Sequence, residues 1–272
     1  RIDNKSWQRN KFFFNLLYIF FKYLEKLYLQ KSDFTIVLTY KIKYFFLKNY
    51  NLNKKKLIVL PCVANFDKYK ILNDKKIIYL KRIYKLSSND LIIGYFGSIS
   101  NIYMPNEMID LFLFSKKYFK NPKIIFFSDD FDYLLKHVDN FKNLKKEDYS
   151  LFSPKEKDLC KYYNLCDLTL CFVVNSFARK ASSPTKIGES LACGIPVLCN
   201  KNVGDIDKII PKIYKNGLVN SNKKNEIKKL SRNLKQFKSI NKKRIRNMSK
   251  EIYDSNRVTK PYLKIYNYLI KY

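Results

Sequence analysis

The stretch Ala181–Val197, ASSPTKIGESLACGIPV, indicates the fold of this chain more clearly than any other. It reads as a polar loop of Ser, Thr and Lys, a helix with one glutamate, and then Gly-x-Pro and a strand. Free backbone N–H groups at a helix N-terminus, together with hydroxyls and a lysine, are donors suited to a phosphate. Glu189 follows Thr185 and Lys186 by one helical turn, so all three lie on one side. We predict that this stretch binds a diphosphate and that Glu189 accepts hydrogen bonds from a ribose diol.

Outward from this stretch, short apolar runs alternate with helical patterns. Strands are expected at 34–39, 57–60, 91–96, 123–127, 149–152, 167–173, 195–199 and 217–219. Helices are expected at 11–30, 40–50, 105–119, 131–140, 154–166, 185–193, 205–210, 223–237, 242–253 and 261–270. This order predicts an α/β fold, in which a doubly wound, Rossmann-like parallel sheet is covered by helices on both faces. Ligands bind at the carboxyl ends of such strands, so the loops Gly97–Ser100 and Ala178–Lys186 should share one edge.

The composition indicates a folded protein with a strong positive charge. The 272 residues are 46% hydrophobic and 16% aromatic, which argues against disorder, and the formal net charge is +31. Most of the basic residues are lysines spread over every segment, alongside Ile, Asn, Tyr and Phe, residues that share A/T-rich codons. We therefore expect no nucleic-acid partner, and we keep attraction to an anionic membrane surface open.

The cysteines do not indicate a metal site. None of the six belongs to a CxxC pair, most lie in apolar runs, and the only histidine is His137. We expect buried, reduced thiols in a cytoplasmic protein, with neither a metal nor a cofactor.

The segment Phe12–Phe21 is apolar but is interrupted soon afterwards by Lys22 and Glu25. It is too short to span a bilayer, and no signal peptide is visible. We predict a core helix here, with an interfacial helix as the alternative. The predicted location is the cytoplasm, with a peripheral position at the inner face of the membrane left open.

The stretch Ala181–Val197 resembles the donor-binding run "SPTKxGExLAxGxPV" of GT-B glycosyltransferases of the family 4 type, the glycosyl transferases group 1. The segment Gly94–Phe112 resembles the "GS…WYM…EMxDxF" variant of a second donor-contacting segment. The resemblance implies a nucleotide-sugar donor and the donor-binding residues Gly97, Ser98, Ser182, Ser183, Pro184, Thr185, Lys186 and Glu189.

Two features of the family pattern are missing from this chain. The Arg and Lys that many members place in the first segment are absent, and Ser98 with Tyr103 or Met104 stands near those positions. The first position of the family's paired Glu-x7-Glu is Ala181. Arg179 and Lys180 are candidate replacements for the phosphate-binding cations.

Other positions carry weaker expectations. Ser128, Tyr149 and Phe152 are candidates for the base-binding part, mostly through backbone groups. Asp205 follows Gly204 in a segment that resembles the family's "GxGD", and we expect it to cap the helix that starts there.

The resemblance also implies a division of the chain. Residues 1–60 look like the end of an N-terminal acceptor domain, residues 61–255 like a Rossmann-like donor domain, and residues 256–272 like a helix that returns to the N-terminal domain. The chain would then be truncated at its start. The catalytic residues are unknown and expected mainly in the missing part.

These expectations describe a retaining, metal-independent glycosyltransferase. It would transfer a sugar from a nucleotide-sugar to a glycan or lipid-linked acceptor in surface polysaccharide or glycan synthesis. Two alternatives stay open: a nucleotide-sugar epimerase of the same fold, and a non-enzymatic basic protein that binds membrane or nucleic acid.

Overall fold

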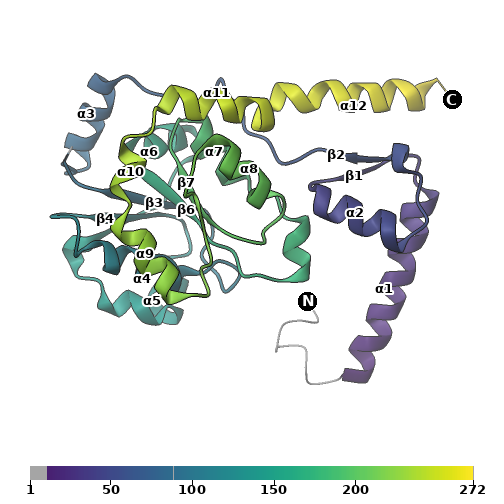
Figure 1. Ribbon diagram of the computed structural model, residues 1–272, viewed down its shortest axis with the longest axis horizontal. Coiled ribbons are helices and arrows are strands. Elements are labelled where there is room, and N and C mark those ends of the chain that lie inside the picture. Colours follow the sequence, from purple (N-terminus) through teal and green to yellow (C-terminus); the bar gives the residue numbers. More distant parts are fainter. Residues whose placement is uncertain (1–10, 88, 272) are drawn as a thin grey trace.

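The computed structural model describes residues 11–87 and 89–271, and its main feature is a six-stranded parallel sheet with the order β5-β4-β3-β6-β7-β8 (Figure 1). Its strands are β3 (Ile92–Phe96), β4 (Lys123–Phe127), β5 (Tyr149–Phe152), β6 (Leu168–Cys171), β7 (Val197–Asn200) and β8 (Leu218–Val219). The chain runs outward from β3 to β5 and then returns to place β6 beside β3. The strand order therefore reverses between β3 and β6, which is the point where doubly wound sheets bind ligands.

Helices cover both faces of this sheet, as predicted. They are α3 (Asp74–Ile83), α4 (Pro105–Ser115), α5 (Phe131–His137), α6 (Leu159–Leu165), α7 (Thr185–Ala192), α8 (Ile206–Ile213), α9 (Lys224–Arg232), α10 (Lys235–Lys238) and α11 (Lys242–Tyr253). α4 packs against α9, while α7 packs against α6 and α11 (Figure 1). The α/β expectation of the sequence is confirmed.

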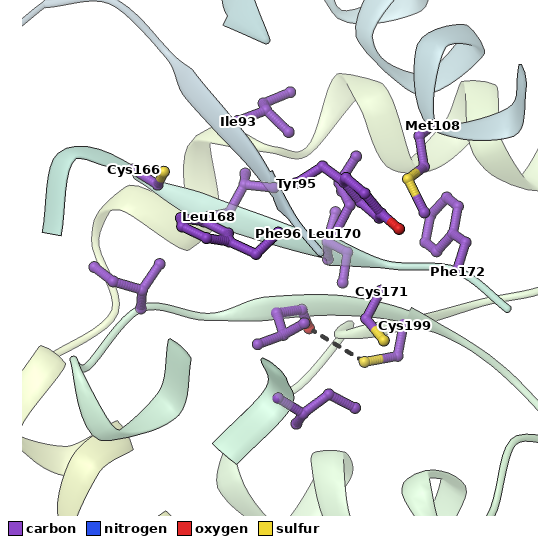
Figure 2. Packing of buried hydrophobic residues seen from close by; sticks show 14 of the residues in the cluster. Ile93, Tyr95, Phe96, Met108, Cys166, Leu168, Leu170, Cys171, Phe172 and Cys199 are labelled. Atoms are coloured by element: carbon purple, nitrogen blue, oxygen red, sulfur yellow. Dashed lines mark hydrogen bonds between the residues drawn. The ribbon is translucent and has the colours of Figure 1, made fainter. Parts of the chain in front are cut away.

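The central strands β3, β6 and β7 are buried at every position, which explains their apolar character. In β3 every residue from Ile92 to Phe96 is at most 4% exposed, apart from Gly94, which is also buried. Figure 2 shows Cys171 and Cys199 facing one another from the paired strands β6 and β7. All six cysteines are free, and Cys62 and Cys160 are only half-buried, whereas we expected the cysteines as a group to be buried.

A smaller unit lies beside the sheet. It contains the parallel pair β1 (Thr35–Val37) and β2 (Leu57–Val59), with α1 (Lys11–Lys31) and α2 (Tyr40–Asn49). The last helix, α12 (Ser255–Ile270), extends from α11 over this unit, and its Tyr268 ring meets Phe34 at 5.5 Å (Figure 1).

Asp205 was expected to cap α8, but its side chain instead links the sheet to the smaller unit. Its carboxylate accepts from the backbone N–H groups of Tyr40 at 2.6 Å and Lys41 at 3.2 Å, so it caps α2 rather than α8. α8 has no side-chain cap. Asp207 adds an ion pair with the Lys41 ammonium at 2.7 Å. The first N–H groups of any helix need acceptors, and tertiary packing brought those of α2 to Asp205.

Three further expectations were wrong in detail. The helix expected from Pro154 starts at Leu159, after a 3-10 turn at Glu156–Asp158. The helix expected at 223–237 is broken into α9 and α10. α3 was not predicted, because no single apolar stripe marks it: Ile78 and Ile83 are exposed, whereas Lys81 is buried.

The core position expected for Phe12–Phe21 was also wrong. Phe12 is 82% exposed, Ile19 65% and Phe21 61%, so α1 carries its apolar side chains on the surface. Within the described ranges, no helix combines the length and apolar character needed to cross a membrane.

Candidate functional site

A cavity of about 410 Å³ opens at the carboxyl edge of the sheet, where the strand order reverses. Its lining comes from the ends of β3 and β4, the β5–α6 connection and the first turns of α7. The lining residues are Phe96, Gly97, Ser98, Phe127, Ser128, Asp129, Asp130, Pro154, Glu156, Leu159, Tyr163, Thr185, Lys186 and Glu189. Six residues of the predicted site thus lie around one cavity: Gly97, Ser98, Ser128, Thr185, Lys186 and Glu189.

Glu189 is held at the cavity wall by a buried tyrosine. The hydroxyl of Tyr163 donates to Glu189 Oε2 at 2.8 Å, and Tyr163 is 1% exposed. Burial and the nearby Glu189 carboxylate raise the pKa of Tyr163 and of Tyr69, so both phenols stay protonated and act as donors. The sequence analysis missed Tyr163, because it predicted a ribose diol as the only hydrogen-bond partner of Glu189.

Lys186 lies between aromatic rings rather than beside a carboxylate. Its Nζ lies 4.6 Å from the ring centroid of Tyr95 and 4.1 Å from that of Tyr103, and it donates to the Tyr95 hydroxyl at 3.4 Å. Burial lowers its pKa. Tyr103 stands near the positions where many family members have a phosphate-binding Arg or Lys. Its ring packs against Lys186 and so helps to position that lysine. The ammonium keeps donors available for an anionic ligand.

Gly97 allows this approach. Its φ is +107°, and a Cβ there would lie 3.0 Å from Lys186 Nζ. The loop that follows is fixed by Asp130, whose Oδ2 accepts from the Ile99 N–H at 3.0 Å. The sequence analysis missed Asp130, since its link to Ile99 crosses from the end of β4 to the end of β3.

Stacked aromatic rings form the floor of the cavity. The rings of Phe96 and Tyr163 stack at 3.8 Å, and those of Phe96 and Phe127 at 4.4 Å. Over the ranges that the structure describes, no group of three or more His, Cys, Asp or Glu residues is placed to hold a metal ion.

Several predicted site residues lie elsewhere. Ser182, Ser183 and Pro184 line a second cavity of about 610 Å³ between the sheet domain and the smaller unit. There the Ser183 hydroxyl accepts from the Cys62 N–H at 3.1 Å. These three residues precede α7 and face the smaller unit, whereas the side chains of Thr185, Lys186 and Glu189 face the first cavity.

The remaining candidates for phosphate and base do not line the first cavity either. Lys180 Nζ lies over the Phe177 ring at 5.0 Å, and the Arg179 carbonyl accepts from the Gly204 N–H. Tyr149 is at the amino end of β5, opposite the ligand edge, and packs on Phe141.

Phe152 sits behind the cavity floor, where its ring stacks on Phe127 and its carbonyl accepts from the Ser128 N–H at 3.0 Å. Phe152 is therefore absent from the cavity lining, and its carbonyl already accepts one hydrogen bond from the end of β4.

The sequence of the sheet domain decides the family. Residues 70–254 match the family described as glycosyl transferases group 1. The chain belongs to this family. A comparison with curated proteins finds no match.

Solved structures show that the fold of this glycosyltransferase is GT-B. HepE from Anabaena, in complex with UDP-glucose, matches with a TM-score of 0.70 at 15% identity, over 89% of this chain and 65% of HepE. A glycosyltransferase from Rickettsia africae matches with a TM-score of 0.68 at 16% identity, over 90% and 67% of the two chains. WaaG, described as involved in lipopolysaccharide biosynthesis, matches with 0.64 at 14% identity, over 83% and 61%. The chain thus spans between 61% and 67% of the length of these structures.

Cys160 lies in the first turn of α6, where its Sγ accepts from the Lys70 N–H at 3.5 Å. A hydrogen bond from Cys193 lowers the pKa of Cys160 to about 6, while burial raises the pKa of Cys62. The thiolate is the nucleophile, so Cys160 should react first with iodoacetamide, at a rate that rises with pH and levels off above about pH 7. Peptide mapping after brief labelling at pH 7 measures this. Faster labelling of Cys62 would contradict it.

Proposed function

We propose that this glycosyltransferase uses the cavity at the β3–β6 crossover to bind a nucleotide-sugar donor, in the manner of a retaining family 4 enzyme. One observation supports this above the others: Gly97, Lys186 at the start of α7, and Glu189 one turn later meet around a single cavity. A diphosphate fits the helix N-terminus and Lys186, and a ribose diol fits the carboxylate.

The proposed reaction breaks the bond between the anomeric carbon and the diphosphate oxygen, and the oxygen of the acceptor hydroxyl forms the new bond to that carbon. The proton of that hydroxyl passes to the leaving diphosphate. Negative charge develops on the leaving diphosphate. Lys186 and the N–H groups of the first turn of α7 are placed to stabilise it, which lowers the barrier for departure. Retention follows from the family 4 resemblance, and NMR of the anomeric configuration of the product tests it.

We also propose the division of labour between the two units. Residues 61–255 would bind the donor, residues 1–60 would belong to an acceptor domain, and residues 256–272 would return to it. The separate β1–β2 pair and the ring contact between Phe34 and Tyr268 support this assignment. The acceptor would be a glycan or lipid-linked molecule in surface polysaccharide synthesis.

The substitution Glu189→Ala tests the donor site. Loss of a charged acceptor for the ribose should weaken nucleoside diphosphate binding by about 1.5–3 kcal/mol, or roughly 10- to 150-fold. Calorimetric titration of UDP, GDP, ADP and CDP measures the effect. Glu147→Ala is a matched control, because this surface glutamate is not part of the cavity lining. An unchanged affinity of Glu189→Ala for nucleoside diphosphates would show that Glu189 does not bind the ribose.

The same titrations separate the alternatives. A basic protein that binds polyanions predicts salt-dependent binding without preference for nucleotides. An epimerase predicts that the donor sugar alone is converted, without an acceptor, which product analysis detects.

We further propose a peripheral position at an anionic membrane surface in the cytoplasm. The exposed aromatic and aliphatic side chains of α1, accompanied by lysines, support it. The chain should sediment with vesicles that contain anionic lipid and should be released by high salt. Equal sedimentation with neutral vesicles would contradict the electrostatic part.

A further inference from the structure

The donor cavity is lined by more negative than positive side chains. Four carboxylates line it, Asp129, Asp130, Glu156 and Glu189, and Lys186 is the one lysine or arginine in the described lining. A cavity for a diphosphate would be expected to carry the opposite balance, so these carboxylates need an explanation in terms of the other parts of the ligand.

Two of the four carboxylates already have a structural or proposed binding role. Asp130 holds the loop after β3 through the Ile99 N–H, and Glu189 faces the ribose in the proposed function. Asp129 and Glu156 are left. They lie at the ends of β4 and after β5, whereas Lys186 lies beside the end of β3.

The strand order then places the base. The sheet runs β5-β4-β3-β6, with the diphosphate at the β3–β6 crossover, so a nucleotide that extends along the cavity carries its base over β4 and β5. That end has the apolar wall of Phe127, Pro154 and Leu159, against which a flat ring can pack. The polar groups there are the carboxylates of Asp129 and Glu156 and the hydroxyl of Ser128.

Both carboxylates keep an oxygen for a ligand. Asp129 Oδ1 accepts from the Ser153 hydroxyl, and Glu156 Oε1 accepts from Lys68 Nζ at 2.5 Å. Neither Asp129 Oδ2 nor Glu156 Oε2 has a further hydrogen bond among the described contacts. The Lys68 bond lowers the pKa of Glu156, so the group is ionised at neutral pH and only accepts.

We infer that the base is guanine, selected by Asp129 and Glu156. This inference rests on the proposed function. Guanine presents two adjacent donors, N1–H and the exocyclic N2 amine, one for the free oxygen of Asp129 and one for that of Glu156. Uracil presents a single N–H between two carbonyl oxygens, and a carboxylate repels those oxygens. Adenine and cytosine each present one amine beside an acceptor nitrogen. Repulsion of the other bases contributes as much to the selection as attraction of guanine.

Calorimetric titration of the full chain with GDP, UDP, ADP and CDP tests the inference. GDP should bind at least about tenfold more tightly than the other three, as expected for a pair of hydrogen bonds to charged groups. The variants Asp129→Asn and Glu156→Gln preserve shape but add an amide donor. The double variant should reduce the preference to less than about threefold while the affinity for UDP stays equal or improves. Asp132→Asn is the control, because Asp132 pairs with Lys136 on the surface at 3.6 Å.

The outcomes are distinguishable. Tight binding of all four diphosphates with equal affinity, or a GDP preference that survives the double variant, would overturn the guanine inference and leave the donor site standing. A folded chain that binds none of the four would overturn both the inference and the proposed function.

Discussion

Lys186→Met should abolish most of the affinity for nucleoside diphosphates and leave the binding of the corresponding nucleosides almost unchanged. Lys186 is the only cation in the described lining of the cavity, and its ammonium makes no ion pair among the described contacts. A charged hydrogen bond of about 1.5–3 kcal/mol corresponds to a loss of roughly 10- to 150-fold. Methionine keeps the chain length and can still pack between Tyr95 and Tyr103.

The pH dependence provides a second measurement. Lys186 attracts the diphosphate only when protonated, and burial lowers its pKa below the usual 10.5. The affinity for a diphosphate should therefore fall as the pH rises through this lowered pKa, at a lower pH than for an exposed lysine. Lys186→Met should remove this alkaline loss. Lys180→Met is the control, since Lys180 lies outside the cavity lining. Equal losses for nucleosides and diphosphates would contradict the phosphate role.

Arg246→Met should lower the free energy of unfolding by about 3 kcal/mol, since hydrogen bonds from charged groups contribute roughly 1.5–3 kcal/mol each and solvent weakens half-buried ones. From α11, the Arg246 guanidinium donates to the carbonyls of Phe66 and Tyr69, both at 2.6 Å, and to that of Ala192. It also lies 5.0 Å from the Phe66 ring centroid. One planar cation thus joins the end of α7 to the segment that enters the sheet domain.

Thermal and urea unfolding measure this effect, and Arg246→Lys should recover only part of it because one ammonium cannot reproduce the fork of donors. Arg244→Met is the matched control. It removes the same charge from the same helix, at an exposed position. If Arg246→Met and Arg244→Met lost equal stability, the loss would come from the change in charge or helix propensity and not from the three carbonyl contacts.

The sequence predicted the sheet well because its signal is local. A strand buried on both faces is apolar almost throughout, so β4 was predicted with its observed bounds, 123–127. The edge strand β5 is only partly buried, and its bounds, 149–152, were predicted as well. The helix end at Gly194 was also readable, since its φ of +71° favours glycine. Lysine-rich surface helices such as α3 gave no comparable signal.

The candidate site was predictable only in part. The pattern of α7 placed Lys186 and Glu189 on one face, and the alternation of strands and helices placed Gly97 on the same edge. Tyr163 and Asp130 were not predictable, because their contacts join segments that are distant in sequence. Ser183 lies apart from the cavity because the loop before α7 faces the smaller unit, and Tyr149 because it stands at the amino end of β5.

The strands of the sheet, most of the helices that cover it and the polar run that starts α7 could thus be read from the sequence, since each depends on residues within one or two turns or one strand. The tertiary structure decided which of those polar residues share a cavity and which serve the packing of the two units. Asp205 shows the reason. The first backbone N–H groups of α2 have no acceptor within the helix, and the Tyr40 N–H donates to the Asp205 carboxylate, more than 160 positions later in the chain, at 2.6 Å. Such a choice depends on the relative position of whole elements, which no local pattern encodes.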